Sequence, residues 1–417
     1  MKSIEKFSLG IGDRFGLQGQ AQLQALVQAR EAGVTVSPVW NKSHREHSLI
    51  GTTQAAVRRE ADEAVSALSW DGAYYVDADH IGLDTVDAFI AESDFFTLDV
   101  ADFTGKRCSR DEITAFVSRH SRLLSDLDIP GIEPRIELTR EMLMTAAEKY
   151  LLAVKEAGRI YRRVVEARGA DDFVTEVSMD ETDAPQTPAD MLTILAAIAD
   201  EGIPAQTIAP KFTGRFNKGV DYVGDLQAFA REFEQDLLVT RYAVREFALP
   251  LNLKLSVHSG SDKFSLYGIV REAIDKHGMG LHLKTAGTTW LEEITGLAAA
   301  GGEALDLAGT VYRNACDRFG ELCGPYASVL DIDTATLPTP DTVDGWSSEE
   351  FVAAVAHDPD NPRYNAGFRQ LMHVAYKVAA EMGDTFLQAV RDNESSIAGR
   401  VTENLFERHV KPLFLGA

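Results

Sequence analysis

The first two thirds of the chain alternate between two hydrophobic patterns. Short apolar segments with period-two alternation predict β-strands, and the longer segments between them have the 3.6-residue period of amphipathic helices. The predicted strands are 3–11, 34–40, 73–79, 95–100, 173–179, 207–212, 252–258 and 280–284. The predicted helices between them are 21–32, 54–68, 83–92, 140–168, 189–200, 226–247 and 267–276. Eight strand–helix repeats require a parallel sheet and favour its closure into a (β/α)8 TIM-type barrel, an α/β fold.

The last part of the chain shows only helical periodicity. Its predicted helices are 289–299, 305–321, 348–357, 368–381, 385–391 and 394–409, and the Pro-, Asp- and Thr-rich segment 331–346 is interpreted as an exposed loop. We expect residues 1–300 to form the catalytic barrel and residues 301–417 a helical C-terminal cap packed on it, so that both form one structural unit. The cap is also a candidate contact for a homo-oligomer.

An open, doubly wound sheet is the competing architecture. Such sheets usually carry a Gly-rich phosphate turn after the first strand. Here the first strand ends in GIG, and Asp13 and Arg14 follow where that turn needs small residues. The nucleotide-binding pattern is therefore weak, and no nucleotide cofactor is expected.

Composition and charge narrow the classes of partner. The 417 residues carry 41 basic and 64 acidic side chains, a formal net charge of -23, which argues against nucleic-acid binding. No stretch is long and apolar enough for a membrane span, and the N-terminal segment lacks the apolar core of a signal peptide. Cys108, Cys316 and Cys323 match neither a zinc spacing nor a disulfide framework, so a reducing, cytoplasmic location is expected.

Polar residues gather where the predicted strands end. The interior of an inert barrel is filled with Val, Ile or Leu, and active sites of such barrels lie at the carboxyl ends of the strands. All eight strands become polar at that end, which packing alone does not explain. These residues are Asp13, Arg14, Asn41, Lys42, Asp77, Asp79, His80, Asp99, Asp102, Glu176, Ser178, Asp180, Glu181, Lys211, Ser256, His258, His282 and Lys284.

Three histidines stand among these strand-end residues. His80, His258 and His282 outline a divalent-metal site with an open coordination position. One such histidine alone would more often be a hydrogen-bonded structural residue, but three beside carboxylates favour metal ligation. The sequence leaves the metal open among Zn, Mn, Co, Ni and Fe. His373, on a predicted cap helix, is interpreted as structural.

The chemistry of such a site follows from its parts. A divalent ion polarises a carbonyl and stabilises an enediolate, and carboxylates on either side of the substrate exchange protons with it. The lysines and Arg14 are candidates for holding an anionic group, although Lys211 and Lys284 have the alternative of pairing with the carboxylates. The set suits aldol-type, isomerase or epimerase chemistry on a polyhydroxylated keto acid. The candidate substrate contacts are Asp13, Arg14, Lys211, Asp180 and Lys284.

Long motifs in these regions resemble the tagaturonate epimerase family, in the family's order and over nearly the whole chain. The motifs are GDRFG (12–16), DADH (77–80), EVSMDETDAPQTP (176–188), KGVDYVGDL (218–226), HSGSDKFSLY (258–267), HLKTAGT (282–288) and RQLMHVAY (369–376).

The resemblance implies reversible interconversion of tagaturonate and fructuronate in hexuronate breakdown, with one divalent metal. Carried over by motif, it implies Asp79 as the general base and Glu176 as the acid. It implies His80, His258 and His282 as metal ligands, with His282 replaceable by a Glu or Asp. The two keto acids differ at a carbon β to the ketone, so a retro-aldol route is expected rather than direct deprotonation.

The sequence departs from the family at two places. Family members carry an additional N-terminal segment, and the stretch GLQGQAQLQAL after GDRFG replaces an expected Thr-Pro turn. Because that loop lies on the rim, a related uronate or a neutral ketohexose stays open as substrate. A metal-dependent aldolase that releases its fragments, and a catalytically silent sugar-acid-binding protein, are the alternative functions.

Overall fold

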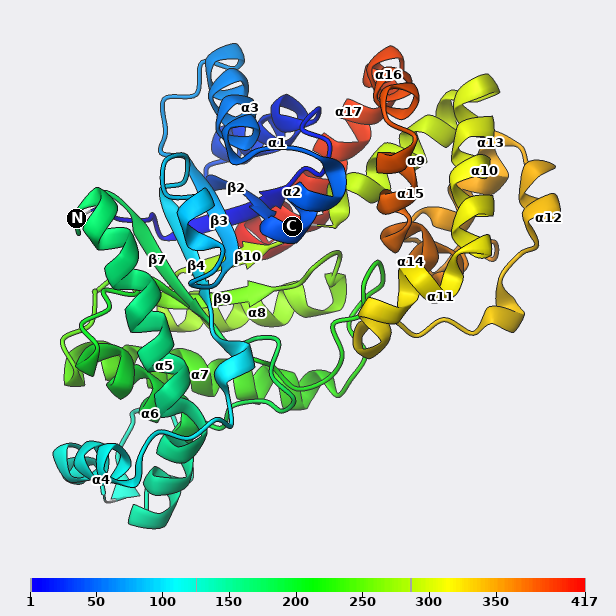
Figure 1. The fold of residues 1–417 in the computed structure, drawn as a ribbon. Helices are drawn as coiled ribbons and strands as arrows, with labels where there is room; N and C mark the ends of the chain where they lie inside the picture. Colours follow the sequence, from blue (N-terminus) through cyan, green and yellow to red (C-terminus); the bar gives the residue numbers. More distant parts are fainter. Residues whose placement is uncertain (1, 125, 286, 417) are drawn as a thin grey trace.

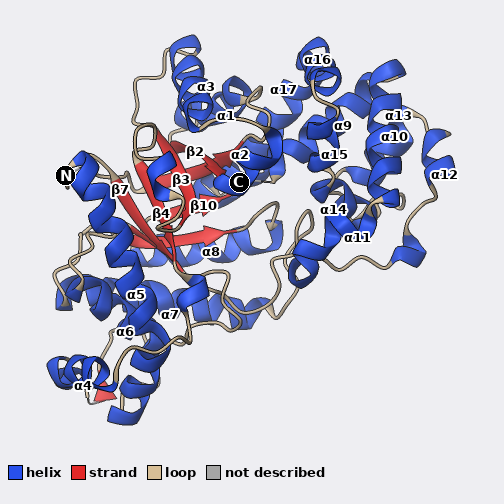
Figure 2. Ribbon diagram, viewed as in Figure 1, coloured by secondary structure: helices blue, strands red, loops and turns tan. Residues whose placement is uncertain are grey.

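Eight parallel strands close into a barrel in the computed structural model, which describes residues 2–124, 126–285 and 287–416. The strand order around the barrel is β1-β10-β9-β8-β7-β4-β3-β2, so each strand pairs with the next barrel strand along the chain and β10 closes onto β1 (Figures 1 and 2). All eight predicted strands and the barrel fold are confirmed. The barrel strands are β1 (Phe7–Gly12), β2 (Ser37–Ser43), β3 (Tyr75–Ile81), β4 (Phe95–Asp99), β7 (Val174–Ser178), β8 (Thr207–Ala209), β9 (Lys254–His258) and β10 (Leu281–Lys284).

Helices surround the barrel as the pattern predicts, with some additions. Those that follow the barrel strands are α1 (Gly19–Glu31), α2 (His44–Ile50), α3 (Gln54–Ala67), α4 (Arg110–Arg119), α5 (Arg140–Arg168), α6 (Pro188–Asp200), α7 (Leu226–Glu246), α8 (Phe264–His277) and α9 (Thr288–Ala300). Short 3-10 turns η1 (Val86–Ala88), η2 (Ala101–Phe103) and η3 (Ser121–Leu123), and a small antiparallel pair, β5 (Asp126–Leu127) with β6 (Ile136–Glu137), lie in the connections.

The prediction of a helix at 83–92 is wrong. Only the three-residue turn η1 forms there. The Thr85 hydroxyl accepts a hydrogen bond from the backbone N–H of Gly82 at 3.0 Å. Such a side-chain bond offers the backbone an alternative to the helical ladder, and β4 begins shortly afterwards.

The barrel interior changes character from one end to the other. At the amino-terminal end of the strands, a small apolar cluster fills the interior; it consists of Ile4, Val39, Tyr75, Phe95 and Val174. Above it, the pairing register places Asn41, Asp77 and Lys284 at inward positions of their strands. The apolar cluster supports the floor of the barrel, and the polar layers above it are free to build a site.

The C-terminal helices extend to one side of the barrel mouth and also pack along its wall (Figure 1). Helix α17 packs against α1 and α9, and η6 packs against α1 and α8. Their bounds are α10 (Gly302–Asp317), α11 (Phe319–Cys323), η4 (Gly324–Val329), η5 (Thr334–Thr336), α12 (Pro340–Asp344), α13 (Ser348–Val355), α14 (Ala366–Val374), α15 (Tyr376–Glu381), α16 (Asp384–Asp392), α17 (Glu394–Glu403) and the π-helical η6 (Asn404–Leu415).

One hydrophobic cluster runs from Leu9 in β1 to Phe414 in η6, so the barrel and the C-terminal helices share a core. A division at residue 300 stays a prediction. Among the residues that the structure describes, no helix combines the length and the apolar character needed to cross a membrane.

Candidate active site

A cavity of about 820 Å³ opens at the carboxyl ends of the strands. Its floor comes from the barrel and includes Asp79, His80, Asp180, His258 and Lys284. Its opposite wall comes from the C-terminal helices and consists of Pro325, Tyr326, Ser328 and Val329 of η4, His373 and Val374 of α14, and Tyr376 of α15. The cap therefore completes the site that the barrel begins.

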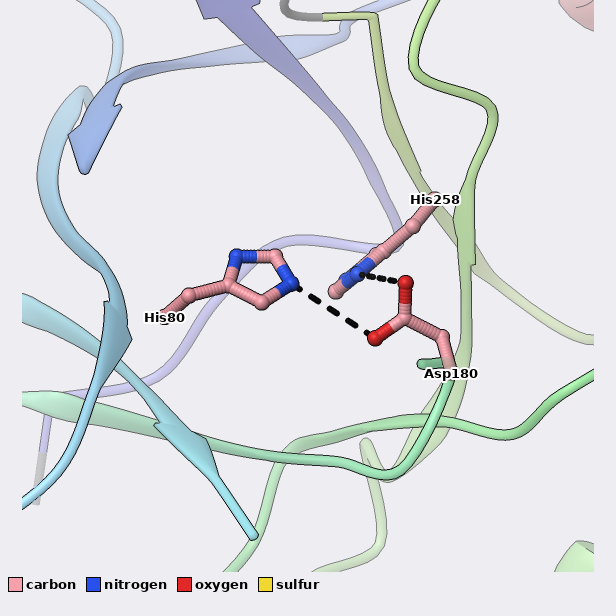
Figure 3. Close-up of side chains that lie close together, drawn as sticks. All are labelled: His80, Asp180 and His258. Atoms are coloured by element: carbon pink, nitrogen blue, oxygen red, sulfur yellow. Dashed lines mark ion pairs between the residues drawn. The ribbon is translucent and has the colours of Figure 1, made fainter. Parts of the chain in front are cut away.

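His80, Asp180 and His258 form a group whose nitrogen and oxygen atoms lie within 4.8 Å of one another. Figure 3 shows a nitrogen of each ring facing the Asp180 carboxylate: one oxygen lies 3.5 Å from His80 Nε2 and the other 3.2 Å from His258 Nδ1. Neither ring nitrogen has a hydrogen-bond partner, although both are buried. Two imidazoles and one carboxylate form an N/O donor set suited to a divalent transition metal with open positions.

The backbone of β3 explains how His80 reaches this group. Successive side chains of a regular strand point to opposite faces, so Asp79 and His80 would not both face inward. The register with β4 shifts between Ala78 and Ile81, and His80 has a left-handed φ of 52°. This bulge turns the His80 ring into the cavity beside Asp79. A non-glycine residue in this conformation is strained, and such strain concentrates at functional sites.

The second nitrogen of each imidazole is held by a carboxylate. His80 Nδ1 lies 2.8 Å from Asp79 Oδ1, and His258 Nε2 lies 2.9 Å from Glu176 Oε1. Each carboxylate accepts the N–H of its ring, which directs the lone pair of the other nitrogen toward Asp180. Metal-binding histidines are commonly oriented in this way.

Lys284 joins the carboxylates beneath the cavity. Its ammonium lies 2.8 Å from Asp77, 2.8 Å from Asp79 and 3.2 Å from Glu176, and it donates to Thr97 at 2.6 Å. Burial and the neighbouring carboxylates raise the pKa of Asp77 to about 7, although Lys284 opposes this shift. Burial would also raise the pKa of Asp79, but Lys284 and His80 outweigh it and hold that pKa below its usual value.

The electrostatic field at the imidazole pair favours a cation. Burial alone would lower the pKa of His80 and His258, but Asp79 and Asp180 outweigh burial at His80, and Asp180 and Glu176 do so at His258. Both pKa values therefore lie above the usual value. A position where carboxylates favour an added proton also favours a metal cation.

The structure does not bring His282 into this group or into the cavity wall. It is fully buried one layer deeper, beside Ser8 and Ser256 in the register. Its Nδ1 lies 2.9 Å from the Ser8 hydroxyl, and burial lowers its pKa to about 3. Asp180, expected from the sequence as a substrate contact, stands in its place.

Asp13 also lies outside the cavity wall. Its two carboxylate oxygens accept hydrogen bonds from the backbone N–H groups of Phe15, Gly16, Leu17 and Gln18. This carboxylate fixes the β1–α1 loop, and that loop positions Arg14 in the cavity wall. Lys211 lines the cavity as well.

Several cavity residues were missed by the sequence prediction. Arg45 and Lys218 line the cavity together with Arg14, and His373, interpreted as structural, reaches it from the cap helix α14. Only one of these positions has a signal in the sequence. Ser43 and Glu46 form the capping box that begins α2, and Arg45 lies in the first turn of this helix. The juxtaposition of the others depends on packing between distant segments.

Comparison with known protein families gives one consistent result. The family model described as tagaturonate epimerase matches residues 2–413. The chain belongs to the tagaturonate epimerase family. A curated relative, the tagaturonate/fructuronate epimerase of Thermotoga maritima, is 27% identical in an alignment 417 positions long that covers 97% of this chain and 80% of the relative. The resemblance seen in the motifs is therefore confirmed, and the family places the chain among epimerases, in the isomerase class.

Solved structures share the fold of this tagaturonate epimerase family member. The native fructuronate-tagaturonate epimerase of Cohnella laeviribosi aligns over 99% of this chain and 82% of its own, with a TM-score of 0.79 and 22% identity. A structure of that protein with two glycerol molecules aligns over 99% and 83%, with a TM-score of 0.81 and 22% identity. The arrangement of barrel and C-terminal helices is thus common to both proteins.

Proposed function

We propose that this chain is a divalent-metal-dependent epimerase that interconverts tagaturonate and fructuronate by retro-aldol and aldol steps. Membership of the tagaturonate epimerase family supports the reaction class. The observation that carries the metal dependence is the pair of buried imidazole nitrogens without hydrogen-bond partners, both aimed at Asp180. His80, Asp180 and His258 are the proposed ligands.

The donor atoms of the proposed ligands suit a metal ion. Carboxylates orient both imidazoles, and one ammonium, Lys284, stands against the carboxylates Asp77, Asp79, Glu176 and Asp180. A divalent cation would offset the excess negative charge. When bound there, it supplies the Lewis acidity that stabilises an enediolate. The metal remains open among Zn, Mn, Co, Ni and Fe, since N/O sites of this type accept several.

Proton transfer falls to the carboxylates around Lys284. Asp79 lines the cavity, and its low pKa keeps it ionised and ready to accept the hydroxyl proton of the carbon β to the ketone. As that proton leaves, the C–C electron pair passes into the enediolate and an aldehyde forms. The bond then forms again on the other aldehyde face, and the new alkoxide takes up a proton.

Glu176 is proposed to assist that second proton transfer as an ionised carboxylate. Burial would raise its pKa, but Lys284 and His258 outweigh burial and hold the pKa well below its usual value. Glu176 is fully buried and outside the cavity wall, so it does not touch the substrate itself. Lys284 lines the cavity and contacts both Glu176 and Asp79. We assign the transfer to Lys284: its ammonium gives a proton to the new alkoxide and regains one from the protonated Asp79, while the charge of Glu176 stabilises the ammonium.

The reaction route is tested by turnover of tagaturonate in deuterium oxide, followed by NMR. We expect fructuronate to form with hydrogen, not deuterium, at the inverted carbon, because the retro-aldol route never breaks that C–H bond. Stoichiometric deuterium at that carbon would overturn the route and indicate direct deprotonation.

A metal-dependent aldolase and a ketohexose epimerase are the alternatives within the same chemistry. An aldolase would release two three-carbon fragments during turnover of tagaturonate, and these are visible in the same NMR spectra. A ketohexose epimerase would convert a neutral ketohexose faster than its uronate. The cationic side chains in the cavity favour the uronate, because a neutral sugar does not use them.

A further inference from the structure

Three cations gather in the cavity on the side of the cap, beside Tyr326 and Tyr376. Arg14 from the β1–α1 loop, Arg45 from α2 and Lys218 from the β8–α7 loop all line it. We refer to them as the cation cluster. The Arg14 guanidinium lies 4.0 Å from the Tyr376 ring centroid, and Arg45 and Lys218 lie 5.1 and 4.9 Å from the Tyr326 ring centroid.

The cation cluster carries more positive charge than its neighbours neutralise. Glu46 pairs with Arg14 Nε at 3.2 Å, and in the described part of the chain it is the one carboxylate that forms an ion pair with the cluster. Burial, with Arg14 and Arg45 close by, lowers the pKa of Lys218 to about 8. A lysine whose pKa is depressed by neighbouring cations is stabilised when an anion binds among them.

Buried donors without partners complete the cluster. Arg14 is 6% exposed, and its Nη1 makes no hydrogen bond. His373 is 1% exposed, and neither of its ring nitrogens makes one. Leaving such groups unpaired costs free energy, so their retention in a cavity wall indicates a ligand that pairs with them. Burial, Arg14 and Lys218 lower the pKa of His373 well below its usual value, so it faces this ligand as a neutral ring.

We propose that the cation cluster and His373 bind the carboxylate of the keto-sugar acid and hold the aldehyde fragment while it turns. This inference rests on the proposed function. The proposed metal ligands and the cation cluster line the same cavity, so a substrate with a ketone at one end and a carboxylate at the other finds a partner for each group there.

The chemistry of the substrate makes this carboxylate contact decisive. Cleavage next to the carbon β to the ketone gives a three-carbon enediolate and a three-carbon hydroxyaldehyde acid, and the carboxylate stays with the aldehyde. Anchored there, the aldehyde turns about the bond to its neighbouring carbon and presents its other face, and the C–C bond forms again. An unanchored aldehyde diffuses away. The cation cluster thus separates an epimerase from an aldolase.

The test combines binding and product analysis on Lys218→Gln and Arg45→Gln, with Lys276→Gln as the matched control. Lys276 is an exposed residue of α8 that pairs with Glu234. Calorimetry measures binding of glycerate, a stable analogue of the aldehyde fragment, and of neutral glycerol. We expect both cluster variants to bind glycerate about 10- to 100-fold more weakly, which is the usual loss of affinity when a hydrogen bond to a charged group is removed. Glycerol binding, and the control variant, should not change.

In turnover of tagaturonate, the cluster variants should show a raised KM and a larger share of free three-carbon fragments. If both variants bind glycerate as tightly as wild type and the enzyme still epimerises tagaturonate, the carboxylate site is overturned while the proposed function stands. Glycerate affinity lost in the variants, while the wild-type protein fails to epimerise tagaturonate, would keep the anion site and overturn the proposed function.

Discussion

Glu176 is the residue whose role the structure changes most. The sequence places it in a strand and family resemblance implies the acid, yet the structure buries it beneath His258 and Lys284. Its carboxylate serves two purposes: it orients the proposed metal ligand His258, and it stabilises the Lys284 ammonium that transfers the proton. Both depend on its single hydrogen-bonded oxygen, Oε1.

Glu176→Gln separates these two purposes. The amide oxygen can still accept the N–H of His258, so metal content measured by plasma mass spectrometry should equal that of wild type. The negative charge beside Lys284 is lost, and turnover should fall by about 10²–10⁴-fold, the usual size of an acid–base contribution. Unchanged turnover would remove Glu176 from the mechanism.

Individual residues were predictable where the chain itself sets their position. His80, His258 and Lys284 follow from strand ends, because the end of a parallel strand opens onto the barrel mouth. The depth of His282 was not predictable, because it lies only two residues before Lys284 in β10, and that spacing separates a buried layer of the barrel from the rim. Asp180 follows β7 in an irregular turn, where period-two reasoning no longer holds.

At the scale of elements, close approaches between segments position the cap wall of the site. The β10–α9 loop passes so near α14 that a Cβ on Gly287 would lie 2.0 Å from His373 Nε2 and 2.6 Å from the carbonyl oxygen of Gly260. At this distance only glycine fits. The position of His373 in the cavity therefore depends on the backbone of a different element.

Gly287→Ala should force α14 and this loop apart. We expect a loss of stability of about 1–3 kcal/mol, the usual cost of overpacking, and a raised KM for tagaturonate as His373 moves. Thermal unfolding and steady-state kinetics measure both. Gly399→Ala is the matched control, because an added Cβ there meets nothing within 4 Å and the residue lies inside α17. It should be neutral or stabilising by about 0.5–1 kcal/mol; equal losses in both variants would contradict the steric argument.

Elements with strong local patterns were predicted, and those that depend on neighbours were not. The barrel strands and long helices such as α5 carry clear periodicity over many residues. The short α2 was missed although Ser43 and Glu46 form a capping box, because a helix of only seven residues shows too little periodicity. The bulge at His80 leaves no trace in hydrophobic periodicity, since it depends on the register between β3 and β4.

At the scale of the whole molecule, a buried ionic cluster joins the barrel to the C-terminal helices. Asp262, after β9, pairs with Arg369 of α14 at 2.6 Å and with His357 at 3.0 Å, and its other oxygen lies 3.5 Å from His409 of η6. Arg369 also donates to the carbonyl oxygen of Val355 at 2.6 Å. This cluster lies outside the cavity wall and holds in place the helix that carries His373.

Asp262→Asn should destabilise the protein by about 3–5 kcal/mol, because it leaves the Arg369 charge buried without its partner. Chemical denaturation measures this loss, and Arg313→Gln, at an exposed ion pair with Asp341, should leave the stability nearly unchanged. Burial would raise the pKa of Asp262, but Arg369 and His357 outweigh it and hold the pKa well below 3.8. Its stabilisation is therefore present above pH 3.8 and is lost as the pH falls toward the lowered pKa. A variant as stable as wild type at neutral pH would contradict this role.

Metal reconstitution shows most directly whether this chain is a metal-dependent epimerase. The purified protein is stripped of metal, Mn, Co, Ni, Zn or Fe is added back with tagaturonate, and products are followed by NMR. We predict no conversion without metal and fructuronate with at least one of these ions, with His80→Ala and His258→Ala failing to bind the ion. Fructuronate formation that survives complete metal removal would contradict the account.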